Sequence, residues 1–167
     1  MMKKGFTLIE MLLYLSILSV VVLALSSFLF LAYNSRVKAT VIAEIEQQGN
    51  QTMSIITQNI RNAQSITTPS SGSSASSLTL SEYSAPLSPT VFAQTGNIMQ
   101  ITEGSNAAIA ISSNRVVVSG LTFQNLSRAS TPGVIRIQFT LNHVNPSNIG
   151  QYIYSKTFTS SASLRYP

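Results

Sequence analysis

The N-terminal third of the chain contains two consecutive helical patterns of different kinds. Residues 11–34 form a run of 24 residues with no charge, proline or glycine, and a helix of that length covers the roughly 30 Å hydrocarbon layer of a membrane. After this run, apolar side chains recur at helical spacing on one face, and polar side chains occupy the others. The stripe consists of Val37, Val41, Ile45, Met53, Ile56, Ile60 and Ala63. The sequence therefore predicts one helix ending near residue 66, with a membrane-spanning part (residues 6–34) and an amphipathic part (residues 35–66).

Two small side chains, Gly49 and Thr52, fill a gap in the middle of this apolar stripe. A glycine at such a position lets a strand approach the helix closely, bends the helix, or is simply tolerated. The sequence leaves these three interpretations of Gly49 open.

The remainder of the chain changes to a period of two, which is typical of strands. Residues 67–77, TTPSSGSSASS, hold too little apolar surface to pack and are predicted to form a mobile surface loop. The predicted strands are residues 78–80, a hairpin of 91–93 and 98–101, then 107–111, 115–118, 121–126, 134–141 and 152–165. We expect residues 78–167 to form an antiparallel β domain covered on one face by the amphipathic helix, which is an α+β fold.

Composition and charge narrow the class of partner. Only 9% of the residues are charged, against about 25% in an average soluble domain. The net charge is +5, but the lysines and arginines are scattered and form no basic run, so nucleic acid is not an expected partner. The low charge suits a protein that packs among copies of itself or its relatives.

The chain offers few groups for catalysis or ligand binding. It contains no cysteine, no aspartate and a single histidine, His143. A Ser-His-Asp triad is therefore impossible, no glutamate is placed by a motif to substitute, and His143 is expected to be an ordinary strand or surface residue. No cluster of metal ligands and no phosphate-binding loop is present, so we expect no metal, no cofactor and no enzymatic activity. Asn125 lies in an N-glycosylation pattern, Asn-Leu-Ser, which also arises by chance.

Charged residues at the N-terminus raise the question of how the apolar run is used. Lys3 and Lys4 precede the run and place that end in the cytoplasm. A cleaved signal peptide, with a site near Ser26, and an uncleaved signal anchor both account for the run but not for Glu10 at its edge. A carboxylate in the membrane is costly unless it is paired. Cleavage after Gly5 would make Phe6 the new N-terminus, and its amine could pair with Glu10 of a neighbouring copy.

Residues 5–10, Gly-Phe-Thr-Leu-Ile-Glu, resemble the prepilin processing motif of type IV pilins and type II secretion pseudopilins. The resemblance implies that residues 1–5 are a leader, that a prepilin peptidase cuts between Gly5 and Phe6, and that the Phe6 amine is methylated. It also implies that Glu10 is the assembly glutamate. Ser19 and Ser27 stand where members of the family often carry a helix-breaking glycine or proline, so local melting of this helix in a filament is not expected.

A looser resemblance concerns the rest of the chain. Residues 60–63, 116–118, 121–123 and 163–165, with an isoleucine-rich penultimate strand, look like the J-type minor pseudopilins and the PilW-like and competence minor pilins. The resemblance implies a minor filament subunit that begins as a single-pass inner-membrane precursor and then joins an extracytoplasmic filament. The implied partners are other pilin subunits, the prepilin peptidase, the assembly platform and the membrane. The alternative function is a membrane-anchored or secreted all-β binding module, such as an adhesin, with an ordinary signal sequence.

Overall fold

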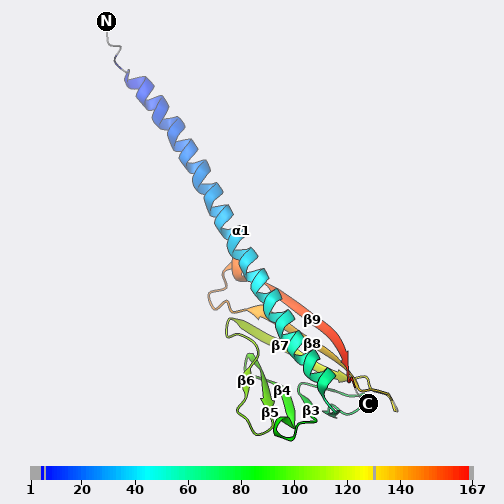
Figure 1. Ribbon diagram of the computed structural model, residues 1–167. Coiled ribbons are helices and arrows are strands. Elements are labelled where there is room, and N and C mark those ends of the chain that lie inside the picture. The colour runs from blue at the N-terminus through cyan, green and yellow to red at the C-terminus, as the bar shows by residue number, and fades with distance from the viewer. Residues whose placement is uncertain (1–4, 6, 130, 166–167) are drawn as a thin grey trace. The chain divides into compact units, whose positions relative to one another are not determined.

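In the part of the chain that the structure describes, one long helix is followed by two antiparallel sheets (Figure 1). The structure, a computed structural model, describes Gly5, residues 7–129 and residues 131–165. The helix, α1, runs from Leu8 to Asn62. Contacts divide the chain into two compact units, with the boundary between Ala39 and Thr40. The first unit holds the apolar part of α1, and the second holds the rest of α1 and all the strands.

The strands of the second unit form one sheet of five strands and one of four. The five-stranded sheet has the order β1-β3-β4-β5-β6, and the four-stranded sheet has the order β2-β7-β8-β9. Every pairing is antiparallel. The bounds are β1 Ser65–Thr68, β2 Ser74–Ala75, β3 Leu78–Ser81, β4 Thr90–Thr95, β5 Ile98–Glu103, β6 Ile109–Ala110, β7 Val116–Asn125, β8 Val134–His143 and β9 Ser155–Ser163, with 3-10 turns at Ala85–Leu87 and Gly150–Tyr152.

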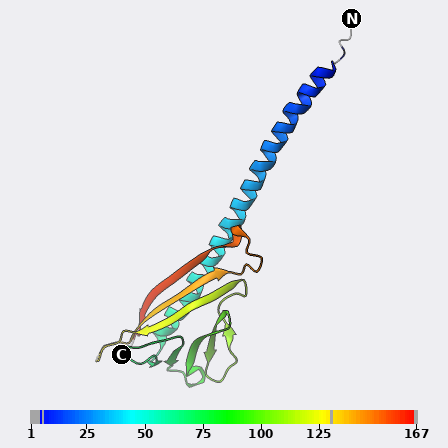
Figure 2. The same cartoon turned by 180° about the vertical axis from the view of Figure 1, so that it is seen from behind.

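The second half of α1 lies on one face of the four-stranded sheet, as the two opposite views show (Figure 2). One stripe of the helix is buried there, and its members are Val41, Ile45, Gly49, Thr52, Ile56 and Ile60. These side chains join one hydrophobic core with alternating residues of both sheets, including Phe92, Phe123 and Phe139, which are fully buried. The predicted α+β fold, with an amphipathic helix covering antiparallel sheets, is confirmed.

The close approach at Gly49 settles its role among the three possibilities. A Cβ atom built on Gly49 would lie 2.0 Å from Cζ of Phe158 on β9, so the ring occupies the space that any side chain would need. The ring of Phe158 in turn stacks on Phe139, with ring centroids 5.5 Å apart. Gly49 therefore permits close helix–sheet packing, and α1 continues through it as a helix.

The helix ends four residues before the predicted boundary at residue 66. Gln64 N donates to Ser81 O at 2.8 Å, and Ile66 pairs with Leu80 in the ladder between β1 and β3. The β-branched residues 66–68 favour a strand, and the residue before Pro69 disfavours helical dihedral angles. A strand therefore replaces the last predicted turn of the helix.

The serine-rich segment is not a loop throughout, as its composition predicted. It contains the end of β1 and the short strand β2, which pairs with β7. The Asn125 side chain donates from Nδ2 to Pro69 O at 2.7 Å, and its backbone N donates to Ser73 O at 2.9 Å. The segment is held by hydrogen bonds rather than by apolar contacts, which is why its composition was misleading. Because the Asn125 amide is buried and bonded, it is not accessible as a glycosylation site.

Three strand predictions also differ from the structure in their extents. The predicted strands 115–118 and 121–126 are one strand, β7, with a register shift between Ser119 and Thr122 at Gly120, whose φ is +61°. Glycine adopts this left-handed conformation without strain and so lets the strand bulge and continue. The last strand, predicted at 152–165, is β9, and the residues before it form a 3-10 turn. The predicted hairpin is confirmed, with β4 and β5 paired across a turn at Gly96.

Replacing Gly49 with alanine should destabilise the second unit. The new methyl group would overlap the buried Phe158 ring, and overpacking of this kind costs about 1–3 kcal/mol, more than the roughly 1 kcal/mol gained in helix propensity. We expect thermal unfolding of the full chain in detergent to show a lower Tm. Gly150→Ala is the matched control, because nothing lies within 4 Å of its added Cβ. An unchanged Tm for Gly49→Ala would show that the helix does not pack as described.

Candidate functional site

The N-terminus of α1 is closed by a capping box formed by Thr7 and Glu10. The Glu10 backbone N donates to Thr7 Oγ1 at 3.4 Å, and Glu10 Oε2 accepts from both the backbone N and the hydroxyl of Thr7, each at 3.3 Å. Such a box satisfies backbone donors that the first turn of a helix cannot satisfy itself. The carboxylate also lies at the positive end of the helix dipole. The spacing Thr-x-x-Glu was visible in the sequence as a capping signal, but Thr7 was not singled out there.

The predicted processing residues are only partly covered by the structure. Phe6, Lys3 and Lys4 lie outside the described residues, so the pairing of Glu10 with a Phe6 amine stays a prediction. Gly5 is exposed, and an added Cβ would meet nothing within 4 Å. The conformation of Gly5 therefore gives no steric reason for a glycine at this position.

The apolar part of α1 is not covered by any of the described residues. From Leu8 to Tyr33 its large apolar side chains are exposed on every side of the helix. Within the described residues, α1 is the one helix that is long and apolar enough to cross a membrane. This segment and the prepilin motif together indicate a membrane-anchored precursor.

The four serines of this segment do not interrupt the helix. Each hydroxyl donates to a backbone carbonyl one turn earlier, at 2.8–3.0 Å; the pairs are Ser16 to Leu13, Ser19 to Ser16, Ser26 to Val22 and Ser27 to Leu23. A hydroxyl bonded in this way adds little cost in lipid, where an unsatisfied polar group would be expensive. The helix passes through Ser19 and Ser27 without a break.

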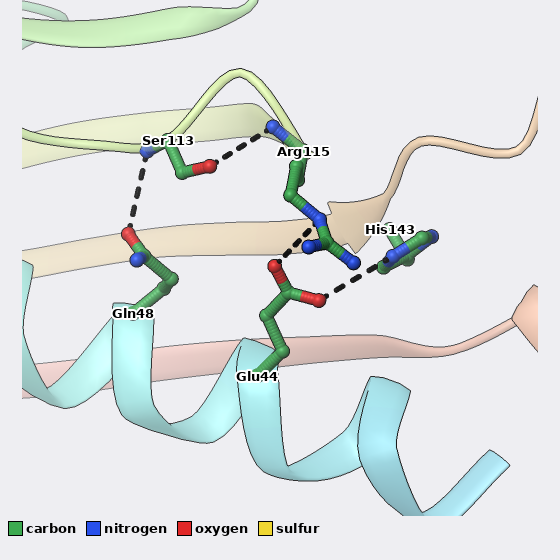
Figure 3. A network of polar contacts seen from close by, with 5 residues as sticks. All are labelled: Glu44, Gln48, Ser113, Arg115 and His143. Carbon is green, nitrogen blue, oxygen red and sulfur yellow. Dashed lines mark hydrogen bonds and ion pairs between the residues drawn. The ribbon is translucent and has the colours of Figure 1, made fainter. Parts of the chain in front are cut away.

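A polar cluster in the second unit centres on Glu44 (Figure 3). Glu44 Oε1 lies 2.9 Å from Arg115 Nε, and its Oε2 lies 3.7 Å from His143 Nε2. One turn later, Gln48 Oε1 accepts from the Ser113 backbone N at 3.3 Å. These contacts join the helix to the start of β7 and the end of β8. They fix which turn of the helix faces which strand.

His143 is the last residue of β8, so the prediction of a strand residue is confirmed, but its side chain does not lie on the surface. Its side chain is only 8% exposed, and its ring stacks on Tyr152 at a centroid distance of 5.5 Å. Neither ring nitrogen has a hydrogen-bond partner among the described residues. Nothing in the sequence pairs His143 with a glutamate, because Glu44 is far away along the chain and only the fold brings the two residues together.

A second ion pair joins Glu46 of α1 to Lys156 of β9. Lys156 Nζ donates to Glu46 Oε1 at 2.7 Å and lies 5.5 Å from the centre of the Phe158 ring. The hydrogen bond to Glu46 raises the pKa of Lys156, although partial desolvation opposes this. Both side chains remain largely accessible, so this pair adds specificity to the helix–sheet packing rather than much stability.

Directly after β3 the chain carries a partly buried carboxyl group, Glu82. Its Oε1 is buried without a hydrogen-bond partner among the described residues. Burial, together with the negative charge of Glu103, raises the pKa of Glu82 above its ordinary value of 4.5. The two glutamates do not form part of a larger set of ligands, because no group of three or more metal-ligating side chains occurs among the described residues.

Comparison with known proteins gives one match, at the N-terminus. The family model described as the prokaryotic N-terminal methylation motif matches residues 1–26. No curated protein and no solved structure matches the chain. The matched residues include the predicted cleavage point, Glu10 and the first part of the apolar run. They support a type IV pilin-like prepilin leader and a pilin-like or pseudopilin-like role for the chain.

The Glu82 carboxyl group should make stability depend on pH. The folded chain retains the Glu82 proton at pH values where the unfolded chain has lost it, so the free energy of unfolding falls as pH rises from 4.5 through the raised pKa. Glu82→Gln has no titrating carboxyl group at this position and therefore removes this fall in the free energy of unfolding. We expect a higher Tm than that of the parent at pH 7 and an equal Tm well below pH 4.5. Glu46→Gln is the control: it breaks a pair with Lys156 and should give no gain at pH 7.

Proposed function

We propose that the chain is a minor subunit of a type IV pilus or of a type II secretion pseudopilus. In this proposal a prepilin peptidase cuts between Gly5 and Phe6, and the new Phe6 amine is methylated. Residues 6–34 anchor the mature subunit in the inner membrane until it is incorporated into a filament. There the apolar part of α1 packs against the same part of other subunits. The chain acts by assembly and carries out no catalysis of its own.

One observation carries this proposal: a carboxylate, Glu10, stands directly before the uncharged apolar run of residues 11–34, within a matched N-terminal methylation motif. Translocation by an ordinary signal peptide or anchor does not require that carboxylate, and moving it into lipid would cost free energy. A cationic partner offsets the cost. An N-terminal amine created by cleavage is the cation that the motif itself would supply, and pairing between subunits would fix their axial register.

The surroundings of Gly5 support processing at this position. Since a side chain would fit there without a clash, the folded chain does not need glycine at residue 5. A peptidase that must bring the scissile bond close to its own catalytic groups has a reason to prefer a residue without a side chain. The glycine is therefore better explained by recognition than by folding.

The assignment to a minor subunit is supported by the positions that resemble minor pilins. They are core positions of the second unit: Ile60 and Ala63 end the helix stripe, and Val116, Val118 and Phe123 line β7. Their likeness therefore concerns the residues that build the fold. The alternative of an all-β binding module fits this less well, because α1 contributes a full stripe to the core.

The mature N-terminus tests processing directly. Mass spectrometry of the chain purified from membranes should give a sequence that starts at methylated Phe6, because cleavage after Gly5 exposes that amine. The control is Gly5→Trp, which should block cleavage and leave the leader attached. A start near Ser27, or a retained Met1 in the unaltered chain, would favour an ordinary signal sequence or anchor and contradict the proposal.

Two substitutions at Glu10 separate its charge from its capping role. Glutamine can replace glutamate in a capping box but carries no charge, whereas leucine removes both functions. If Glu10 pairs with an amine, Glu10→Gln and Glu10→Leu should both reduce incorporation into sheared filaments by roughly tenfold or more, since about 1.4 kcal/mol already gives that factor. Processing should be unaffected in both. Normal incorporation of Glu10→Gln would show that capping alone explains the residue.

A further inference from the structure

The segment between β8 and β9 presents aliphatic side chains to solvent from a firmly held backbone. Val144, Ile149 and Ile153 are exposed. The stretch of residues 144–155 contains no charged residue. It also carries Tyr152 and Tyr154, and tyrosine is enriched where proteins meet the membrane–water interface. We name residues 144–153 the apolar loop.

Hydrogen bonds hold the backbone of the apolar loop at several points. Asn145 holds both polar groups of Ile149: its Nδ2 donates to Ile149 O and its Oδ1 accepts from Ile149 N, each at 2.9 Å. Tyr152 N donates to Ile149 O at 3.0 Å, and Val144 N donates to Arg115 O at 2.9 Å. The N–H groups of Val144, Ile149 and Ile153, the three residues with exposed aliphatic side chains, are therefore bonded already and would not be left bare if those side chains entered a less polar medium.

The Glu44 cluster fixes where this loop lies along α1. The His143 ring stacks on Tyr152 of the loop and faces the Glu44 carboxylate. The Arg115 guanidinium pairs with the same carboxylate, and the Arg115 backbone O accepts a hydrogen bond from Val144 N. Ten residues separate Glu44 from Asn34, the end of the apolar run. That length corresponds to a rise of about 15 Å in a helix and to at most about 35 Å in an extended chain. The loop is thus tethered within reach of the membrane surface.

The short distance along α1 between Glu44 and the apolar run, together with the exposed aliphatic side chains of an uncharged loop, carries the proposal. We infer that the apolar loop contacts the surface of the membrane in which α1 is anchored. Val144, Ile149 and Ile153 enter the boundary between headgroups and acyl chains, and the neighbouring charges, Arg115 and Lys156, stay in water with their glutamate partners. The contact would hold the second unit against the bilayer before assembly. This inference rests on the membrane anchorage that is part of the proposed function, but it does not depend on filament formation.

Tryptophan fluorescence provides the test, because the chain contains no tryptophan of its own. Ile153→Trp and Ile149→Trp each place a single reporter in the apolar loop. Tyr83→Trp is the matched control: Tyr83 is 60% exposed against 57% for Ile153, and it lies next to β3, which pairs with β1 beyond the C-terminal end of α1. The full chain is inserted into phospholipid vesicles, and insertion is verified by resistance to alkaline extraction.

Replacing the vesicle lipid with brominated phospholipid should quench the loop reporters by about twofold, as expected for side chains at the acyl boundary, and leave the Tyr83→Trp signal nearly unchanged. Inserted chains whose loop reporters are not quenched would overturn the inference and leave the proposed function standing. A loop signal that shifts to the blue only when subunits assemble would overturn it in favour of a neighbouring subunit. Chains that are extracted at alkaline pH would contradict the anchorage, and with it both proposals.

Discussion

The apolar surface of α1 between Leu8 and Tyr33 has to be removed from water, and none of the residues that the structure describes covers it. Each large apolar side chain left exposed forgoes about 1.5–3 kcal/mol, so the whole segment represents far more free energy than the roughly 5–15 kcal/mol that stabilises a typical domain. Lipid satisfies this constraint in a single subunit, and the apolar helices of other subunits satisfy it equally well in an assembly. The same surface can therefore serve both states, since neither environment requires a different pattern of side chains.

The second half of the same helix obeys a different constraint, because it must fit one face of a sheet. Its buried stripe contains Gly49 where the Phe158 ring approaches, and it is flanked by Glu44 and Glu46, which pair with strand residues. The apolar contacts supply most of the stability. The ion pairs are at least partly exposed and add little to it, but a helix shifted by one turn would lose all of them. They therefore select one register for the helix on the sheet.

The helix, the hairpin of β4 and β5 and the strand β8 could be predicted because each follows a regular apolar period that local sequence displays. The serine-rich segment could not, because its order comes from hydrogen bonds to Asn125, a residue distant along the chain. The same holds for His143, whose partner on α1 is supplied only by the fold. At the N-terminus the local motif is sufficient to predict Gly5, Phe6 and Glu10 as candidates. The capping role of Glu10 follows from the Thr-x-x-Glu spacing, which is equally local.

Capping and pairing do not compete for the Glu10 carboxylate. Among the described residues, both hydrogen bonds from Thr7 reach the same oxygen, Oε2. The other oxygen, Oε1, can accept from a second donor without breaking the box. The box also holds the carboxylate against the first turn of α1, so less side-chain entropy is lost when a cation arrives. A subunit with its carboxylate already oriented at the helix end would thus bind a neighbouring amine more tightly than one with a free side chain, and Thr7 would contribute to assembly through Glu10.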